Sequence, residues 1–256
     1  MNIALLGYGS IAGSHVRAIR SLGDRELRLH SVMGRLAEPA GQFAREHGLA
    51  RATTDLDELL ADPALDLVIV CSPSDVHAEQ TERALRAGKH VLCEIPLALS
   101  LAQTDRLTAL ADEVDRRLMV CHTQRYWASS IAARRLIADG ELHAHALFGR
   151  FMFHRRENIN WMGRRRSWTD NLLWHHGCHA VDTSLWLLGA SDVEVAAQVA
   201  LPGGNLDIPM DLALAMRTPR DQVVSIDMSY NTHIPYNGYQ VIGEENTLLM
   251  TSQELR

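Results

Sequence analysis

The chain has 256 residues, of which 46% are hydrophobic and 22% are charged. This composition is typical of a globular protein and excludes disordered, collagen-like and fibrous classes. The 31 acidic residues outnumber the 25 basic ones, which gives a formal net charge of −6. Such a balance argues against general binding of nucleic acid or of an anionic membrane, so we expect neither as a partner.

The N-terminus has no basic segment and no small-residue cleavage site, so no signal peptide is predicted. No run of about 18 apolar residues predicts a membrane span. The four cysteines lie far apart in the sequence, at Cys71, Cys93, Cys121 and Cys178. Reduced thiols explain this spacing better than a disulfide framework does, and a cytoplasmic location is expected.

The first 120 residues alternate short apolar runs with longer amphipathic stretches. Strands are expected over 2–6, 27–33, 67–71, 90–94 and 118–121, and helices over 11–22, 37–47, 54–60, 75–87 and 101–117. Continuous apolar strands separated by helices are typical of a parallel sheet with helices on both faces. We therefore predict an α/β domain with a doubly wound parallel (Rossmann) sheet over residues 1–122.

The pattern changes after residue 122. Helices are expected over 130–138 and 172–188, and strands over 142–154, 193–201, 210–216, 222–230, 238–242 and 247–250. Strands that follow one another with only turns between them indicate an antiparallel sheet. Residues 123–256 are therefore predicted to form an α+β domain with a mostly antiparallel open sheet. The open face of such a sheet is suited to self-association, so we expect a homodimer or a higher homo-oligomer.

A glycine-rich turn follows the first expected strand and begins the first expected helix. The sequence Gly7-Tyr8-Gly9-Ser10-Ile11-Ala12 has the pattern G-x-G-x-x-A. In that pattern the first glycine permits a tight turn, the second allows a pyrophosphate to approach the backbone, and the small last residue allows close packing. Gly7, Gly9, Ser10 and Ile11 are therefore predicted to bind a dinucleotide at a helix N-terminus. A glycine-rich turn with no ligand is the alternative.

The end of the second expected strand bears on cofactor choice. NAD-preferring sites usually place an acidic side chain there, on the ribose 2′-hydroxyl. In this chain no acidic residue lies between the start of that strand and Glu38. Arg35 could instead form a planar, charge-assisted contact with a 2′-phosphate. NADP is the favoured cofactor and NAD stays possible, because Arg35 could also be a solvated surface residue.

The segment VIVCSPSDVHAEQTERALRAGKHVLCEIP, residues 68–96, resembles the glucose–fructose oxidoreductase, inositol dehydrogenase and rhizopine-catabolism (Gfo/Idh/MocA) family of oxidoreductases. The resemblance extends over nearly the whole chain. It implies that the cofactor is contacted at the ends of two strands, by Cys71, Ser72, Pro73, His77, Glu94 and Pro96. Members of the family usually run longer at the C-terminus, so this chain is expected to be shorter than its relatives.

Residues 154–160 and 166–182, together with the tetrad at 122–125, resemble one branch of that family. The branch uses NADP to oxidise the cyclised hemiacetal of a dicarboxylate semialdehyde from aromatic ring cleavage. Two departures from the wider family count against a sugar substrate. The usual lysine is Ile95, and the usual aspartate of a D-x-x-x-H signature is His175.

The resemblance implies that His179 is the catalytic base, with His175 or His176 orienting it or the substrate. On a regular helix His175 and His179, or His176 and His179, would share a face. An imidazole titrates near neutral pH and suits removal of a hydroxyl proton. Zinc binding through Cys178 with His175 and His179, and plain buried histidines, are the alternatives; no metal site is predicted.

Arginines are predicted to bind the substrate carboxylates. Residues 151–170 contain five arginines and two acids, a local charge of +3 within an acidic chain. Arginine binds carboxylates through a bidentate fork. The predicted substrate residues are Arg125, Arg155, Arg166, Trp168 and Thr169. A solvated basic loop or an oligomer contact is the other interpretation of these arginines.

The predicted function is an NADP-dependent dehydrogenase that acts on a small dicarboxylate semialdehyde. The first alternative is an oxidoreductase of the same family with a different anionic or sugar-like substrate. The second is a catalytically silent NADP-binding sensor, which the missing lysine would suit.

Overall fold

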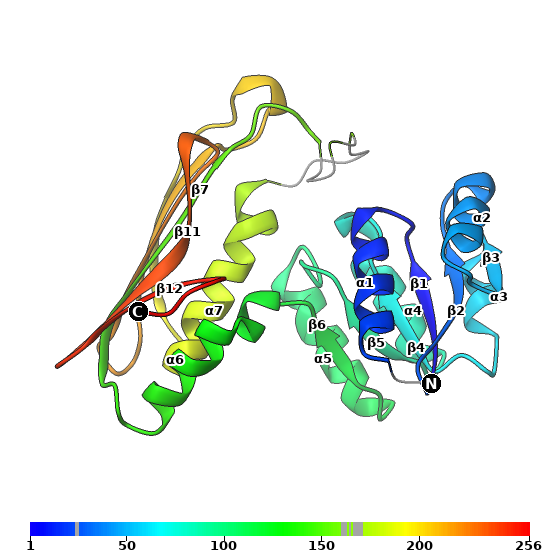
Figure 1. Cartoon of the computed structure of the whole chain (residues 1–256), viewed down its shortest axis with the longest axis horizontal. Helices are drawn as coiled ribbons and strands as arrows, with labels where there is room; N and C mark the ends of the chain where they lie inside the picture. The colour runs from blue at the N-terminus through cyan, green and yellow to red at the C-terminus, as the bar shows by residue number, and fades with distance from the viewer. Residues whose placement is uncertain (24–25, 160–162, 164, 166–170) are drawn as a thin grey trace. The chain divides into compact units, whose positions relative to one another are not determined.

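The computed structural model describes residues 1–23, 26–159, 163, 165 and 171–256 (Figure 1). The chain forms two compact units, Met1–Cys121 and His122–Arg256. Each unit has its own sheet and its own hydrophobic core. No helix within the described ranges is long and apolar enough to cross a membrane.

The first unit contains a six-stranded, fully parallel sheet in the order β3-β2-β1-β4-β5-β6. The strands are β1 (Asn2–Leu6), β2 (Arg28–Met33), β3 (Arg51–Thr53), β4 (Leu67–Val70), β5 (His90–Cys93) and β6 (Leu118–Val120). The helices are α1 (Ser10–Ser21), α2 (Ala37–Glu46), α3 (Leu56–Leu60), α4 (His77–Arg86) and α5 (Leu101–Glu113), with a 3₁₀ turn, η1, at Ser74–Val76. This is the predicted doubly wound fold.

The apolar side chains of the central strands divide between two clusters. In β1, Ile3 and Leu5 belong to one buried cluster, and Ala4 and Leu6 belong to the other. Since successive side chains of a strand point to opposite faces, both faces of the sheet are buried. The strand order reverses between β1 and β4, and ligands of such sheets bind at the carboxyl ends of the strands beside that reversal.

The second unit contains a six-stranded sheet in the order β12-β11-β7-β10-β9-β8. The strands are β7 (Ala144–His154), β8 (Glu194–Val199), β9 (Asp211–Arg217), β10 (Val223–Ser229), β11 (Asn231–Gly243) and β12 (Thr247–Thr251). The helices are α6 (Ala128–Ala138) and α7 (Cys178–Leu188), with short turns η2 (Thr123–Tyr126), η3 (Leu173–Gly177) and η4 (Gly204–Leu206). Among the described strands of this second sheet only the β7–β10 pair is parallel, which confirms the mostly antiparallel sheet.

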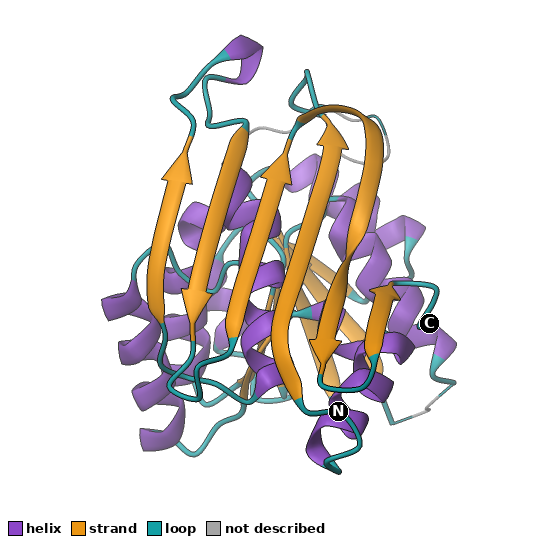
Figure 2. Cartoon of the chain, turned by 90° about the vertical axis from the view of Figure 1, so that its left-hand side faces the viewer, coloured by secondary structure: helices purple, strands orange, loops and turns teal. Residues whose placement is uncertain are grey.

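One face of this sheet is covered and the other is open (Figure 2). Alternate residues of β10, Val224, Ile226 and Met228, are buried in the same core as Leu187 of α7. On β7, Phe148 keeps 41% of its surface exposed. The sheet is therefore an open one, with its own helices on a single face.

One strand is longer than the sequence pattern predicts. The Asn237-Gly238 pair is typical of a turn, and a strand is predicted only over 238–242, but β11 is continuous from Asn231 to Gly243 and includes Pro235. Its pairing with β7 shifts register between Asn231 and Tyr236. An irregularity of this kind accommodates a proline, which has no N–H to give to the ladder.

Candidate active site

The glycine-rich turn of the first unit presses closely against the end of β4. Gly7 has φ +118°, and a Cβ on it would lie 2.5 Å from the carbonyl oxygen of Cys71. Its N–H donates to the carbonyl of Met33 at 2.8 Å. Only glycine has both the conformational freedom and the small size for this position. Gly7 therefore permits the chain to turn tightly from β1 into α1.

Gly9 and the start of α1 form a surface that suits an anion. A Cβ on Gly9 would meet nothing within 4 Å, so its outer side is open. Gly9 is the N-cap residue of α1 and, as a glycine, has no side chain with which to cap the helix. The first N–H groups of a helix and its dipole favour negative charge. The turn thus suits an anion, and the predicted contact of Gly7, Gly9, Ser10 and Ile11 with the pyrophosphate of a dinucleotide stays a prediction.

Arg35 is exposed in the turn after β2. The ring of Tyr8 packs directly on the neighbouring Gly34, where a Cβ would lie 2.0 Å from a ring carbon. The nearest acidic residue in sequence, Glu38, is exposed and pairs with Arg45 at 3.1 Å. The first charged residue after β2 is thus a cation, which is compatible with a 2′-phosphate.

His77 joins the two loops that the sequence predicts around the cofactor. The imidazole is 2% exposed; its Nδ1 lies 2.8 Å from the carbonyl of Pro96 and its Nε2 lies 2.8 Å from the carbonyl of Ser72. Ser72 also donates its hydroxyl to Gln80 at 2.6 Å. The His77 ring thus lies between the loops after β4 and β5 and contacts the backbone of both. The predicted contact of His77 with the cofactor stays a prediction.

Glu94 follows β5 and lies among groups that can ionise. Its Oε1 is 2.7 Å from Nε2 of His15, a residue of α1. Burial raises the pKa of the neighbouring thiols: that of Cys71 well above its usual value, that of Cys93 to about 12, and that of Cys121 further still. The charge of Glu94 contributes to all three shifts. These thiols are protonated at neutral pH and are not nucleophiles.

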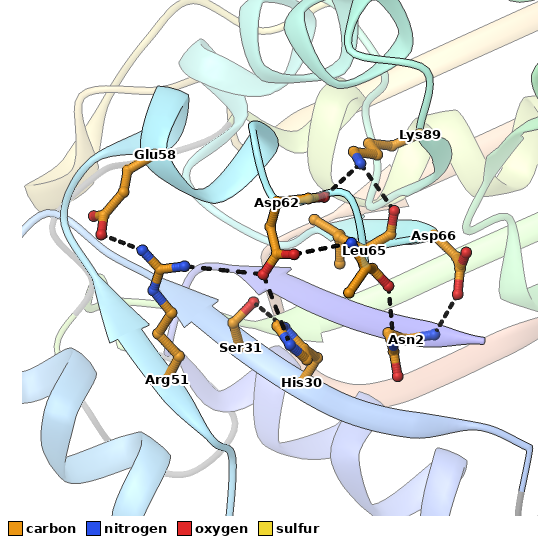
Figure 3. Close-up of polar contacts among 10 residues, drawn as sticks. Asn2, His30, Ser31, Arg51, Glu58, Asp62, Leu65, Asp66 and Lys89 are labelled. Atoms are coloured by element: carbon orange, nitrogen blue, oxygen red, sulfur yellow. Dashed lines mark hydrogen bonds and ion pairs between the residues drawn. The ribbon is translucent and has the colours of Figure 1, made fainter.

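Lys89, the buried lysine of the first unit, takes part in a network of polar contacts that stabilises the fold (Figure 3). Lys89 is 6% exposed and donates to the carbonyls of Asp62 and Leu65 at 2.8 and 2.9 Å. The Asp62 carboxylate in turn lies 3.8 Å from His30 and 3.9 Å from Arg51. Lys89 precedes β5, so it lies at the amino end of a strand, away from the edge where ligands bind.

Two of the predicted catalytic histidines meet at one tyrosine in the second unit. His175 and His176 belong to η3, a five-residue π-helical turn before α7. Their Nδ1 atoms lie 3.1 and 2.8 Å from the hydroxyl of Tyr230, a fully buried residue after β10. The ring of Phe153 stacks on His176 at 4.4 Å. Because the turn is π-helical, the expected regular spacing of three or four residues to His179 does not apply.

His179 lies in the first turn of α7 beside a second polar cluster. Its ring packs edge-on against His122 at 5.8 Å between centroids. His122 Nδ1 is 3.6 Å from the carboxylate of Asp182. Asp182 accepts two hydrogen bonds from Arg125, which raise the pKa of that guanidinium. A carboxylate can stabilise a protonated imidazole, so this cluster suits proton transfer.

The guanidinium of Arg125 thus pairs with Asp182 of the same chain. This pairing does not support the predicted contact of Arg125 with a substrate carboxylate. Arg155 differs. Its Nη2 donates to Asn158 at 3.0 Å, while its buried Nε and Nη1 have no hydrogen-bond partner among the described residues. Its guanidinium lies 5.2 Å from the centre of the Tyr230 ring.

Arg155 also lines a pocket of about 380 Å³ in the second unit, with Arg156, Asn205, Asp211 and Asn231 among the other lining residues. Three predicted substrate residues, Arg166, Trp168 and Thr169, lie outside the described residues.

Sequence reasoning does not single out His15 or Tyr230 as site residues. His15 has helical spacing with Ile11, which indicates only a helix face. Tyr230 ends an alternating apolar strand and resembles any core aromatic residue. Asp182 enters the sequence argument only as part of a motif. The signal that could have identified Tyr230 is a tyrosine at an inward-facing position of an apolar strand. Its hydroxyl would be buried there, and a buried hydroxyl requires a hydrogen-bonding partner.

Together these features define a class of protein: a dinucleotide-binding α/β unit joined to a unit rich in histidine. Residues 1–122 match the family model GFO_IDH_MocA, described as "Oxidoreductase family, NAD-binding Rossmann fold". Residues 128–256 match the model "Bacterial oxidoreductases, C-terminal". The chain therefore belongs to the Gfo/Idh/MocA family of oxidoreductases, as the resemblance predicted.

Among curated relatives, the chain is 36% identical to 4-carboxy-2-hydroxymuconate-6-semialdehyde dehydrogenase of Sphingobium sp., over 92% of this chain and 74% of the relative. It is 29% identical to 1,5-anhydro-D-fructose reductase of Ensifer adhaerens, over 96% of this chain and 74% of that protein. Among solved structures, levoglucosan dehydrogenase in complex with NADH and levoglucosan has a TM-score of 0.88 at 21% identity, and the match covers 100% of this chain and 75% of that one. This last likeness concerns the fold alone.

Proposed function

We propose that this protein is an NADP-dependent dehydrogenase of an aromatic ring-cleavage product. It would oxidise the cyclic hemiacetal of 4-carboxy-2-hydroxymuconate-6-semialdehyde to 2-pyrone-4,6-dicarboxylate, in protocatechuate 4,5-cleavage. The observation that supports this most is the 36% identity to the Sphingobium enzyme of that name over 92% of the chain. Relatives with sugar-like substrates are less similar over a comparable span.

The reaction removes two hydrogens from one carbon–oxygen unit. The hydroxyl loses a proton, the carbon loses a hydride, and a carbonyl forms in the lactone ring. Bound NADP⁺ would supply the hydride acceptor. The open backbone at Gly9 and the uncapped start of α1 would hold its pyrophosphate, and Arg35 would contact the 2′-phosphate.

The second unit would supply the base. A phenol has one proton, yet Tyr230 lies within hydrogen-bond distance of two imidazole nitrogens. At least one of His175 and His176 must therefore donate its Nδ1–H to the phenol oxygen. A neutral ring in that tautomer has its lone pair on Nε2, the form required of a general base. His179, beside His122, is the third candidate, and the resemblance assigns the base to it.

Arg155 would bind a carboxylate of the substrate. Its buried Nε and Nη1 atoms need hydrogen-bond acceptors, since a buried cation without them is costly. A carboxylate supplies two acceptor oxygens with the matching fork geometry. The nearby Arg156, exposed at the same pocket, adds positive charge.

A substrate panel tests the proposal. The purified protein is mixed with NADP⁺ or NAD⁺ and with the semialdehyde, scyllo-inositol or levoglucosan, and reduction of the nicotinamide is followed by absorbance. We expect turnover with the semialdehyde and NADP⁺. Turnover on a polyol alone would assign a different substrate, and nucleotide binding with no turnover on any compound would indicate a silent sensor.

The same assay tests Arg155. Loss of a hydrogen bond to a charged group costs about 1.5–3 kcal/mol, so Arg155→Met should raise KM for the semialdehyde by roughly ten- to hundredfold with a smaller change in kcat. Arg150→Met is the matched control, because Arg150 is an exposed residue of β7 whose acidic partner, Asp227, is 3.9 Å away. Equal KM values for the two variants would contradict the role of Arg155.

A further inference from the structure

Three metal-ligating side chains of the first unit converge from separate elements. His15 comes from α1, Glu94 follows β5 and Cys121 follows β6. One ligand atom of each, an imidazole nitrogen, a carboxylate oxygen and a thiol sulfur, lies within 4.8 Å of the other two. His15 and Glu94 side chains are 15% and 14% exposed, and Cys121 is 6% exposed. No other such group of three occurs among the residues that the structure describes.

The three ligand atoms are close enough that modest side-chain movements would bring them around a tetrahedral cation. Zinc binds nitrogen and oxygen at about 2.0–2.2 Å and sulfur at about 2.3 Å, which places ligand atoms roughly 3.3–3.7 Å apart. The His15 and Glu94 atoms are now 2.7 Å apart, in hydrogen-bond contact. A cation would replace that hydrogen bond, and the two side chains would separate by roughly 1 Å.

We propose that His15, Glu94 and Cys121 form a binding site for one zinc-class divalent cation, with the fourth coordination position left to water or another small ligand. The donor set favours this class. A thiolate selects zinc over magnesium or calcium, which require six or more oxygen ligands. On binding, the Cys121 thiol would release its proton to solvent, as thiol ligands do when they bind a metal. The neutral imidazole, the carboxylate and the resulting thiolate then offset the two positive charges of the cation.

The site has a consequence for cofactor binding, and this part rests on the proposed function. Glu94 is also the residue expected to contact the nicotinamide ribose. A Glu94 carboxylate that is oriented and partly neutralised by a cation would be a weaker hydrogen-bond acceptor for the ribose. The cation and the nucleotide therefore compete, and a zinc-class cation inhibits the dehydrogenase by lowering its affinity for cofactor.

Cobalt(II) is the probe that reports ligand identity. The full-length protein, reduced and stripped of metal, is titrated with Co²⁺ and its absorption spectrum is recorded. We expect the intense near-ultraviolet band of a thiolate–cobalt bond, together with the visible bands of tetrahedral Co²⁺. Cys121→Ser should lose the near-ultraviolet band. Cys178→Ser, which changes a half-buried cysteine in the other unit, should keep it. Circular dichroism confirms that each variant is folded.

A variant of His15 tests the site without changing the buried thiol of Cys121. His15→Ala should weaken Co²⁺ binding by more than about tenfold, since even the loss of an outer-shell partner of a metal ligand costs 10–100-fold. A wild-type protein without the thiolate band would overturn the site. A band that survives in Cys121→Ser, or an unchanged affinity in His15→Ala, would overturn the ligand assignment.

Competition is measured separately. NADP⁺ added to the cobalt-loaded protein should reduce the thiolate band in proportion to nucleotide bound. If the band persists while nucleotide binds, the shared use of Glu94 is wrong and the metal site stands. If no nucleotide binds even in metal-free protein, the proposed function fails, and the cobalt result remains valid by itself.

Discussion

The two units of the protein prepare their sites in opposite ways. The first unit exposes backbone: Gly7 and Gly9 have no side chain, and α1 begins without a side-chain cap. The second unit gathers side chains that titrate or bind protons, with His175 and His176 on Tyr230 and His122 beside Asp182. An anion is bound best by aligned N–H groups, whereas proton transfer requires a group with a suitable pKa.

The buried thiols of the first unit are consistent with a unit that binds an anion and does not transfer protons. Burial raises the pKa of Cys71, Cys93 and Cys121, so none of these thiols exchanges protons near neutral pH. At neutral pH the first unit can bind but cannot provide a thiolate base. A substitution at the open backbone of Gly9 should therefore weaken nucleotide binding, and a substitution at the histidine cluster of the second unit should lower turnover.

The largest expected effect comes from Gly7→Ala. The new Cβ would lie 2.5 Å from the carbonyl oxygen of Cys71, at a positive φ. Backbone strain of this kind costs about 1–3 kcal/mol, and the clash adds to it, so we expect the free energy of unfolding to fall by about 3 kcal/mol or more. Chemical denaturation measures this loss.

Two glycines serve as controls for that experiment. Gly140 has φ +75° with open space around it, so Gly140→Ala should cost only the strain, about 1–2 kcal/mol. Gly9→Ala meets no atom within 4 Å and should leave stability nearly unchanged while it weakens nucleotide binding. If Gly9→Ala bound cofactor as tightly as the wild type, the pyrophosphate would not lie at this turn.

The next effect tests the second unit. Tyr230→Phe removes the hydroxyl that holds His175 and His176. A buried hydrogen-bonding group left unpaired costs about 1–3 kcal/mol, and we expect a similar loss in transition-state stabilisation, a roughly tenfold to hundredfold fall in kcat. Nucleotide affinity should not change. Steady-state kinetics and calorimetry separate the two quantities.

Tyr239→Phe is the matched control. Tyr239 is also fully buried, but its hydroxyl donates to Gln124. Both variants should lose stability, and only Tyr230→Phe should lose turnover. If both variants kept normal turnover, the phenol would be a core residue and His179 with His122 would become the stronger candidate for the base.

The sequence was sufficient for the parts of the molecule that repeat a local pattern. The continuous apolar run of β4 predicted the sheet that is buried on both faces. The alternation of apolar and polar residues in β10 predicted the sheet that is buried on one face. The strand β3 was missed, since three residues are too few to show a period. The π-turn η3 was missed because the sequence rules for helices assume regular α spacing.

The site itself was predictable only where backbone chemistry determines it. The G-x-G-x-x-A pattern located the turn correctly, because a tight turn after a strand requires glycine at Gly7. The side-chain clusters could not be predicted in this way. His176 and Tyr230 are 54 residues apart in sequence, and His15 and Glu94 are 79 apart. Such pairs depend on the tertiary fold, and one sequence contains no direct signal for them.

The effect expected to be smallest at neutral pH concerns the buried thiols of the first unit, because it appears only as a dependence of stability on pH above 9. Cys93 has a pKa of about 12 in the folded protein, against an ordinary value of 9.0. Between these values the unfolded chain releases the thiol proton and the folded chain retains it, so the folded state binds more protons. The free energy of unfolding therefore falls as pH rises from 9 to 12, by up to about 1.4 kcal/mol per pH unit for this thiol. The contribution is fully present below pH 9.

Replacement of Cys93 by alanine removes that titration. The variant should lose stability at neutral pH, where a buried side chain is truncated, but its stability should fall less steeply than that of the wild type between pH 9 and 12. The difference in slope is the informative quantity, because every other titrating group is common to the two proteins. Denaturant midpoints measured at intervals across this range give both slopes. Parallel curves would mean that the Cys93 thiol ionises in the folded protein as it does in the unfolded chain, and that the carboxyl edge of β5 admits water.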